Sequence, residues 1–135
     1  MATILGVDDH LPTRELMRAL FQSQGHRVLL ATNGPEAIAL AGKERPDLVF
    51  ADVVMPAMDG YALVGRLREQ AGCKGVPVVL MSASLDEGRA RALAAQCGAT
   101  EYLVKPVEPA HLLATARRIL ANRENGAAAG HDPRR

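Results

Sequence analysis

The chain has 135 residues, the length of one ordinary domain, and its 48% hydrophobic and 23% charged residues are typical of a globular protein. Its 16 basic and 15 acidic side chains leave a net charge of +1, which gives no reason to expect direct binding to nucleic acid. The apolar runs are too short to span a membrane and the N-terminus lacks the pattern of a secretion signal, so we expect a cytoplasmic protein that does not contact the membrane.

Short apolar runs alternate along the chain with longer segments of helical spacing. The runs are rich in Val, Leu and Ile and predict strands buried on both faces, at residues 4–7, 28–31, 48–51, 76–81 and 102–104. The segment after each run carries apolar side chains three and four residues apart, which predicts an amphipathic helix. The apolar faces contain, in turn, Met17 and Phe21, Ala37 and Ala41, Leu63 and Leu67, Ala90 and Ala94, and Leu112 and Ala116.

Local sequence signals mark several helix ends. Gly25 is placed to end the first helix, and Asp59 with Gly60 is typical of a turn and cap that opens the third. Residues 84–87 have the pattern of a capping box, with Ser84 opening the fourth helix. From residue 122 onward the apolar period is lost, so we expect residues 122–135 to be a flexible C-terminal tail or linker.

Repeated strand–helix units predict an α/β fold with a single doubly wound five-stranded parallel sheet, because each crossover helix returns the chain to the same sheet edge. In such sheets the functional crevice lies outside the carboxyl ends of the strands. Five polar residues follow the predicted strands closely: Asp8, Asp9, Asp52, Ser82 and Lys105. A single acid at a strand end is usually a helix cap or a loop residue, but five such residues at one edge indicate a functional site.

The three acids of this set predict a metal site. Crowded carboxylates in a partly desolvated crevice repel one another, so either their pKa values rise or a cation neutralises them. Magnesium prefers oxygen ligands and takes one or two carboxylates together with waters, so we expect Mg²⁺ between Asp8 or Asp9 and Asp52. Cys73 and Cys97 lack the spacing of a zinc site, and we expect them to be buried or idle thiols.

The site residues occur in four motifs, namely Val7-Asp8-Asp9, residues 52–60, Met81-Ser82-Ala83 and residues 102–106. In this order and spacing they resemble the receiver domains of bacterial two-component response regulators, over residues 3–121. The resemblance implies a receiver domain at residues 1–121 with the flavodoxin-like strand order 2-1-3-4-5 and a cis Lys105-Pro106 bond.

By this resemblance, Asp52 is the phosphoacceptor, which takes a phosphoryl group from a histidine kinase or a phosphotransfer protein in a magnesium-dependent reaction. Attack on an anionic phosphoryl group needs charge neutralisation, which Mg²⁺ and Lys105 would supply. The implied metal ligands are Asp8, Asp9, Asp52 and the backbone carbonyl of Val54. Ser82 resembles the hydroxyl switch that responds to the phosphoryl group, and Tyr102 resembles the aromatic switch that follows it.

The resemblance implies a signalling protein rather than an enzyme, because its only chemistry is its own phosphorylation and autodephosphorylation. We expect an output protein or output domain as the second partner, and a monomer or a phosphorylation-dependent dimer. The chain is then either a stand-alone receiver or the N-terminal receiver of a longer protein.

Three alternative functions fit these residues less well. A degenerate receiver that binds partners without phosphorylation is disfavoured because all five site residues are present. A flavodoxin-like FMN protein would need a Ser/Thr/Gly-rich loop where this chain has Asp8 and Asp9, which would repel the flavin phosphate. A haloacid-dehalogenase-type phosphatase would carry an Asp-x-Asp pair on its first strand, whereas here the acids are adjacent.

Overall fold

Strands and helices alternate strictly in the computed structural model, which describes residues 1–83 and 86–128, without the side chains of residues 124–128. The strands are β1 (Thr3–Val7), β2 (Arg27–Ala31), β3 (Leu48–Asp52), β4 (Val78–Ser82) and β5 (Glu101–Val104). The helices are α1 (Leu11–Ser23), α2 (Gly34–Glu44), α3 (Gly60–Glu69), α4 (Glu87–Cys97) and α5 (Pro109–Ala128). Each predicted apolar run therefore contributes a strand, and each segment of helical spacing a helix.

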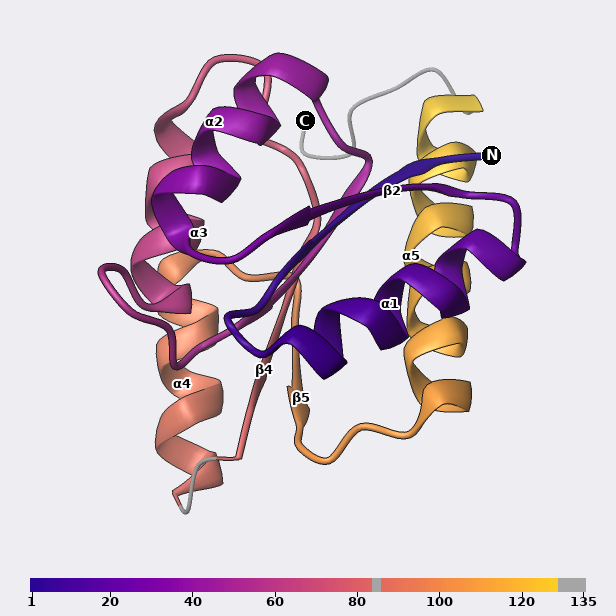
Figure 1. The fold of residues 1–135 in the computed structure, drawn as a ribbon. Coiled ribbons are helices and arrows are strands. Elements are labelled where there is room, and N and C mark those ends of the chain that lie inside the picture. Colours follow the sequence, from indigo (N-terminus) through magenta and orange to yellow (C-terminus); the bar gives the residue numbers. More distant parts are fainter. Residues whose placement is uncertain (84–85, 129–135) are drawn as a thin grey trace.

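All strands pair in parallel in the order β2-β1-β3-β4-β5, which confirms the expected architecture (Figure 1). β4 begins two residues later than the apolar run, after Pro77, whose carbonyl still accepts the amide of Val49 at 2.9 Å. A proline has no amide hydrogen to donate to the ladder, so it stands before the strand rather than inside it. No described helix is both long and apolar enough to cross a membrane.

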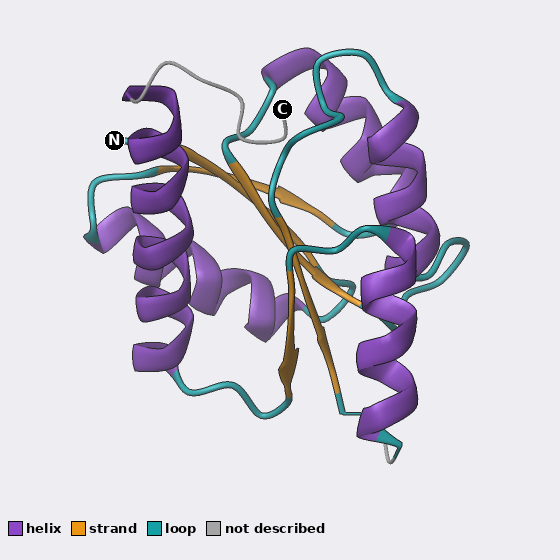
Figure 2. Ribbon diagram, turned by 180° about the vertical axis from the view of Figure 1, so that it is seen from behind, coloured by secondary structure: helices purple, strands orange, loops and turns teal. Residues whose placement is uncertain are grey.

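Helices cover both faces of the sheet, with α1 and α5 on one face and α2, α3 and α4 on the other (Figures 1 and 2). Neighbouring strand residues therefore enter different cores: Ile4 packs in the core with Met17 and Phe21, whereas Leu5 packs in the core with Leu63 and the other residues of α2 and α3. This explains why the strands are continuously apolar rather than alternating.

Local capping follows the sequence at the start of α3 and departs from it at the start of α4. The side chain of Asp59 accepts the amide of Ala62 at 2.8 Å, as expected for the cap of α3. The predicted cap of α4 was wrong: its N-cap is Asp86, which accepts the amide of Arg89 at 3.0 Å, and Ser84 lies outside the described residues. A carboxylate both accepts the free amide and interacts with the helix dipole, whereas a hydroxyl only accepts the amide.

The C-terminal segment differs from the expectation of a flexible tail beginning at residue 122. α5 continues to Ala128, and the Arg123 guanidinium donates to the carbonyl of Asp47. Ala121, Arg123 and Glu124 are good helix formers, so the helix can continue after its apolar stripe has ended, although Asn122, Asn125 and Gly126 favour it less. Residues 129–135 lie outside the described part of the chain.

Candidate functional site

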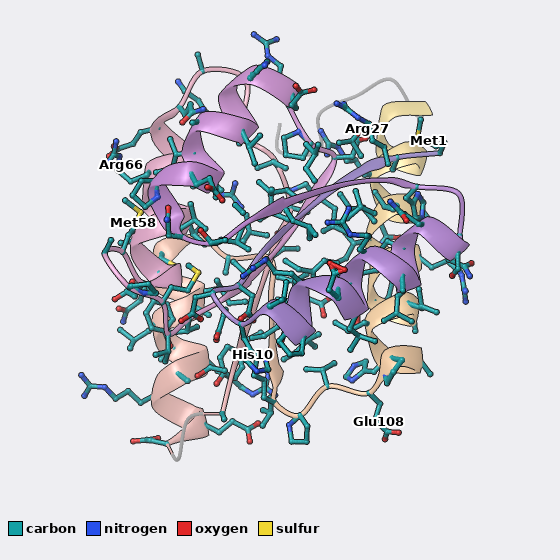
Figure 3. All side chains as sticks on the ribbon, in the orientation of Figure 1. Met1, His10, Arg27, Met58, Arg66 and Glu108 are labelled. Atoms are coloured by element: carbon teal, nitrogen blue, oxygen red, sulfur yellow. The ribbon has the colours of Figure 1, made fainter. Side chains whose placement is uncertain are left out.

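The parallel sheet brings the predicted site residues to one edge. β1, β3, β4 and β5 all end there, and the residues stand at or directly after these ends: Asp8, Asp9, Asp52, Ser82 and Lys105. The amide of Lys105 donates to the carbonyl of Ser82 at 2.9 Å, which joins the ends of β4 and β5. In Figure 3, His10, which follows the acid pair, and Glu108, before α5, lie at this same end of the molecule.

Asp8, Asp9 and Asp52 form a compact acidic cluster. One carboxylate oxygen from each lies within 4.8 Å of the others. Asp8 is fully buried and Asp52 is 8% exposed, whereas Asp9 is open to solvent. Carboxylate oxygens in this arrangement are the donors that a hard divalent cation prefers, with water completing its coordination on the exposed side. The donor set therefore fits Mg²⁺.

Several contacts hold Asp8 in place. Its backbone amide donates to the carbonyl of Ala31 at 3.1 Å, and one carboxylate oxygen accepts the amide of His10 at 2.8 Å. The Arg14 guanidinium donates to the backbone carbonyl of Asp8 at 2.8 Å. A buried carboxylate with fixed hydrogen bonds keeps its orientation, so Asp8 presents its second oxygen to the centre of the site.

That second oxygen meets the ammonium of Lys105. The Lys105 Nζ lies 3.3 Å from Asp8 Oδ2 and 3.2 Å from Asp52 Oδ2, so one cation bridges two buried carboxylates. Burial raises the pKa of Asp52 and the charge of Asp8 raises it further, although Lys105 acts in the opposite direction. Burial lowers the pKa of Lys105, but the two carboxylates outweigh it and leave this pKa above its ordinary value. Lys105 is therefore a fixed positive charge beside Asp52.

Ser82 and Tyr102 lie next to this charged centre. Both are buried, at 5% and 6% exposure, and the Tyr102 hydroxyl is 3.5 Å from the carbonyl of Ser82. The Arg91 guanidinium stands over the Tyr102 ring, with its Cζ 5.2 Å from the ring centroid, and donates to the Tyr102 carbonyl at 3.3 Å. The Tyr102 ring is thus turned inward in this structure and is held by α4.

Arg14 and Arg91 contact the site but were not predicted from the sequence. The helix dipole favours negative charge near the start of a helix, so an arginine in the first turns of α1 is unfavourable by itself. This was the available signal that Arg14 has an acidic or carbonyl partner. No local signal indicated Arg91, because its partner Tyr102 belongs to another element. Val54 is 71% exposed beside the site, and its amide lies 3.4 Å from Asp52 Oδ1.

A groove with a volume of about 430 Å³ opens beside Lys105, between α1 and the connection from β5 to α5. Its walls are mainly apolar and include Leu16, Met17, Pro106 and Val107. The Lys105-Pro106 bond in this connection is cis, as the resemblance implied. Elsewhere, Cys73 and Cys97 are both free thiols, in agreement with the sequence.

Comparison with known proteins assigns this arrangement to a family. Residues 4–117 match the response regulator receiver domain. The chain belongs to this family. Protein PilH of Pseudomonas aeruginosa is 36% identical to this receiver domain over 121 residues, which cover 90% of this chain and 99% of PilH.

Solved structures agree in fold. The chemotaxis response regulator CheY4 of Vibrio cholerae superposes on this receiver domain with a TM-score of 0.83 at 35% identity, covering 88% of this chain and 98% of that chain. The receiver domain of the sensor histidine kinase PA1611 of Pseudomonas aeruginosa superposes with a TM-score of 0.80 at 30% identity, covering 89% and 98%. That structure has a magnesium ion coordinated in its active-site cleft. The family assignment excludes the flavin-protein and phosphatase alternatives.

Proposed function

We propose that Asp52 is the phosphoacceptor of this receiver domain and takes a phosphoryl group from a phosphohistidine of a histidine kinase or a phosphotransfer protein, in the cytoplasm. The observation that carries the proposal is the position of the Asp52 carboxylate, which is within 4.8 Å of the acid pair and 3.2 Å from the Lys105 ammonium. Asp9 is also acidic, but it is exposed to solvent and has no described contact with Lys105.

The proposed step is a displacement at phosphorus. An Asp52 oxygen forms a bond to phosphorus while the bond from phosphorus to the donor imidazole nitrogen breaks, and that nitrogen keeps the electron pair. Burial makes ionised Asp52 costly, and Lys105 keeps a positive charge beside it. Asp8, Asp9, Asp52 and the carbonyl of Val54 would hold a magnesium ion, which supplies further positive charge for the phosphoryl oxygens when bound.

The switch is proposed to pass through Ser82 and Tyr102. Only a contact that exists in one state shifts a two-state equilibrium, and the Ser82 hydroxyl would gain such a contact with the phosphoryl group. Ser82 stands beside Lys105 at the end of β4, and Tyr102 is 3.5 Å from its carbonyl. An output protein or output domain would then read the changed surface formed by α4, β5 and α5, with the domain as a monomer or a phosphorylation-dependent dimer.

Intact-mass analysis after incubation with acetyl phosphate tests this function. We expect one phosphoryl group per chain in the presence of Mg²⁺, little or none in EDTA, and none in Asp52→Asn. Glu15→Gln removes an exposed acid of α1 that pairs with Arg18 and is the matched control, which should be phosphorylated like the wild type. A full adduct in Asp52→Asn would contradict the assignment, and an absence of adduct in the wild type would favour a receiver that binds partners without phosphorylation.

A further inference from the structure

α4 has few long side chains of its own in the core. Its buried residues are Ala90 and Ala94, at 3% and 4% exposure. An alanine buries little apolar area, so the position of this helix depends on longer side chains that reach it from neighbouring elements. Arg68 of α3 is one of these, because its guanidinium donates to the carbonyl of Gly98, the C-cap of α4, at 2.9 Å.

Tyr61 is a second long side chain that reaches α4, at the first turn of that helix. It belongs to the first turn of α3, is half-buried, and packs against the core that contains Ala90 and Tyr102. Its hydroxyl is 3.5 Å from the Ala90 carbonyl. Tyr102 lies near the same helix, because the Arg91 guanidinium of α4 stands over its ring. Burial raises the pKa of the Tyr61 hydroxyl, and the neighbouring Tyr102 adds to this.

Tyr61 is also coupled to the end of β3 through the residue before it. The Gly60 amide donates to the carbonyl of Val53 at 2.8 Å. A Cβ atom on Gly60 would lie 2.8 Å from the Asp52 carbonyl oxygen and 2.9 Å from Val53 Cα, so the two backbones are in direct contact. Because packed atoms cannot interpenetrate, a displacement of the backbone at Asp52 also displaces the start of α3.

We propose that Tyr61 is a positioning residue that couples the state of Asp52 to α4 by a route through Gly60 that does not pass through Ser82. The proposal rests on the proposed phosphorylation of Asp52. The 3.5 Å contact with Ala90 is at the outer limit of a hydrogen bond, so a movement of α3 by a fraction of an ångström either strengthens or breaks it. A contact that is made in one position of α3 and lost in the other would shift the position of α4.

The test compares amide chemical shifts of Ala90 and Ala94 before and after acetyl phosphate and Mg²⁺, with intact mass measured on the same samples. In Tyr61→Leu we expect the wild-type amount of adduct and a wild-type response of the Ser82 amide, but less than half of the wild-type response at Ala90 and Ala94. Tyr61→Phe keeps the ring and loses only the hydroxyl, so we expect an intermediate response and a fold as stable as the wild type.

Arg68→Ala is the matched control, because it loosens the C-terminal end of α4 without touching the Asp52 backbone. We expect it to lower the thermal midpoint while leaving the phosphorylation-dependent shifts of Ala90 and Ala94 intact. The role of Tyr61 would be overturned, with the proposed function intact, by either of two results. One is a full shift of the Ala90 and Ala94 amides in phosphorylated Tyr61→Leu, and the other is an equal loss of these shifts in Arg68→Ala. An absence of adduct in the wild type would instead overturn the proposed function and this role with it.

Tyrosine fluorescence gives an independent measurement, because the chain has two tyrosines and no tryptophan. In Tyr102→Phe, Tyr61 is the only tyrosine left. We expect its emission to change on phosphorylation of this variant, and not in the Asp52→Asn, Tyr102→Phe double variant under the same conditions. An emission that does not change while the adduct forms would contradict the proposed movement at Tyr61.

Discussion

Replacing Lys105 with methionine would remove the ammonium that bridges Asp8 and Asp52 and keep most of the apolar stem of the side chain. Two opposite charges about 4 Å apart attract by about 4 kcal/mol at an effective dielectric constant of about 20. Desolvation of the ions offsets much of this attraction, and removal of one partner of a buried pair typically costs about 3–5 kcal/mol. Because the Lys105 side chain is 27% exposed and Asp52 can take up a proton, we expect a smaller loss. We expect Lys105→Met to lower the free energy of unfolding by about 2–3 kcal/mol in EDTA at pH 8.

Urea unfolding measures this loss. With a slope of about 1–3 kcal/mol per molar urea, a loss of about 2–3 kcal/mol should lower the midpoint of Lys105→Met by roughly 0.7–3 M in EDTA. Saturating Mg²⁺ should remove most of the deficit, because the metal supplies the missing positive charge. Lowering the pH should also remove the deficit in stability, because loss of Lys105 raises the pKa of Asp52 still further. Below the ordinary pKa of 3.8, Asp52 is protonated in both the folded and the unfolded chain and the destabilisation is absent. The destabilisation grows as the pH rises through the folded-state pKa of Asp52.

Two further variants separate this effect from a general loss of lysine. Lys74→Met replaces an exposed lysine and should change the midpoint little under any of these conditions. In an Asp52→Asn background, Lys105→Met should cost less than in the wild type, since only the Asp8 carboxylate remains unpaired. Equal stability of Lys105→Met and the wild type in EDTA at pH 8, or a deficit unchanged by Mg²⁺, would refute the view that Lys105 is the countercharge of the acidic cluster.

Asp9→Asn should weaken Mg²⁺ binding at least tenfold, with metal-free stability unchanged or slightly higher because carboxylate repulsion falls; titration calorimetry checks this, and an unchanged affinity would remove Asp9 from the ligand set. The raised pKa of Asp52 makes its ionisation costly, so the metal-free stability of the wild type should fall as the pH rises above about 4, and Asp52→Asn should flatten this dependence. Urea unfolding at several pH values checks this, and parallel profiles of the wild type and the variant would argue against it. Val54→Asn places an amide beside the phosphoryl group to orient water and should speed phosphoryl decay about tenfold, or about 1.4 kcal/mol of barrier, whereas an unchanged decay rate by intact mass would mean that bulk solvent controls it. Ala57 has a φ of 72°, so Ala57→Gly should raise the unfolding free energy by about 0.5 kcal/mol in thermal melts, and a lower melting point would contradict the strain at this residue.

The carboxyl-edge site was predictable because its residues are placed by the strands that precede them. A strand buried on both faces must be continuously apolar, so Asp8, Asp52 and Lys105 stand out where the apolar runs stop. Parallel strands end at one edge, which brings these side chains together whatever the details of the helices. The order of the strands came from the resemblance to receiver domains, because periodicity alone does not determine which strands are neighbours.

The cap of α4 and the end of α5 show where local signals were insufficient. Ser84 and Asp86 are both good N-caps two residues apart, and the choice between them depends on where the helix packs against its neighbours. The apolar stripe of α5 ends before the helix does, and residues such as Ala121, Arg123 and Glu124 can continue a helix that has no buried face. The contact of Arg123 with the Asp47 carbonyl joins residues distant in sequence and has no local signature.

The sequence by itself therefore determined the class of fold, the edge of the sheet that carries the chemistry, and the acids that meet there, since these depend on burial and periodicity along the chain. Only the tertiary structure decided that one ammonium bridges Asp8 and Asp52, that Arg91 holds Tyr102 inward, and that Tyr61 reaches Ala90. Each of these contacts joins different secondary-structure elements, and its geometry depends on how helices and strands pack, which is a property of the whole core and not of any local stretch of residues.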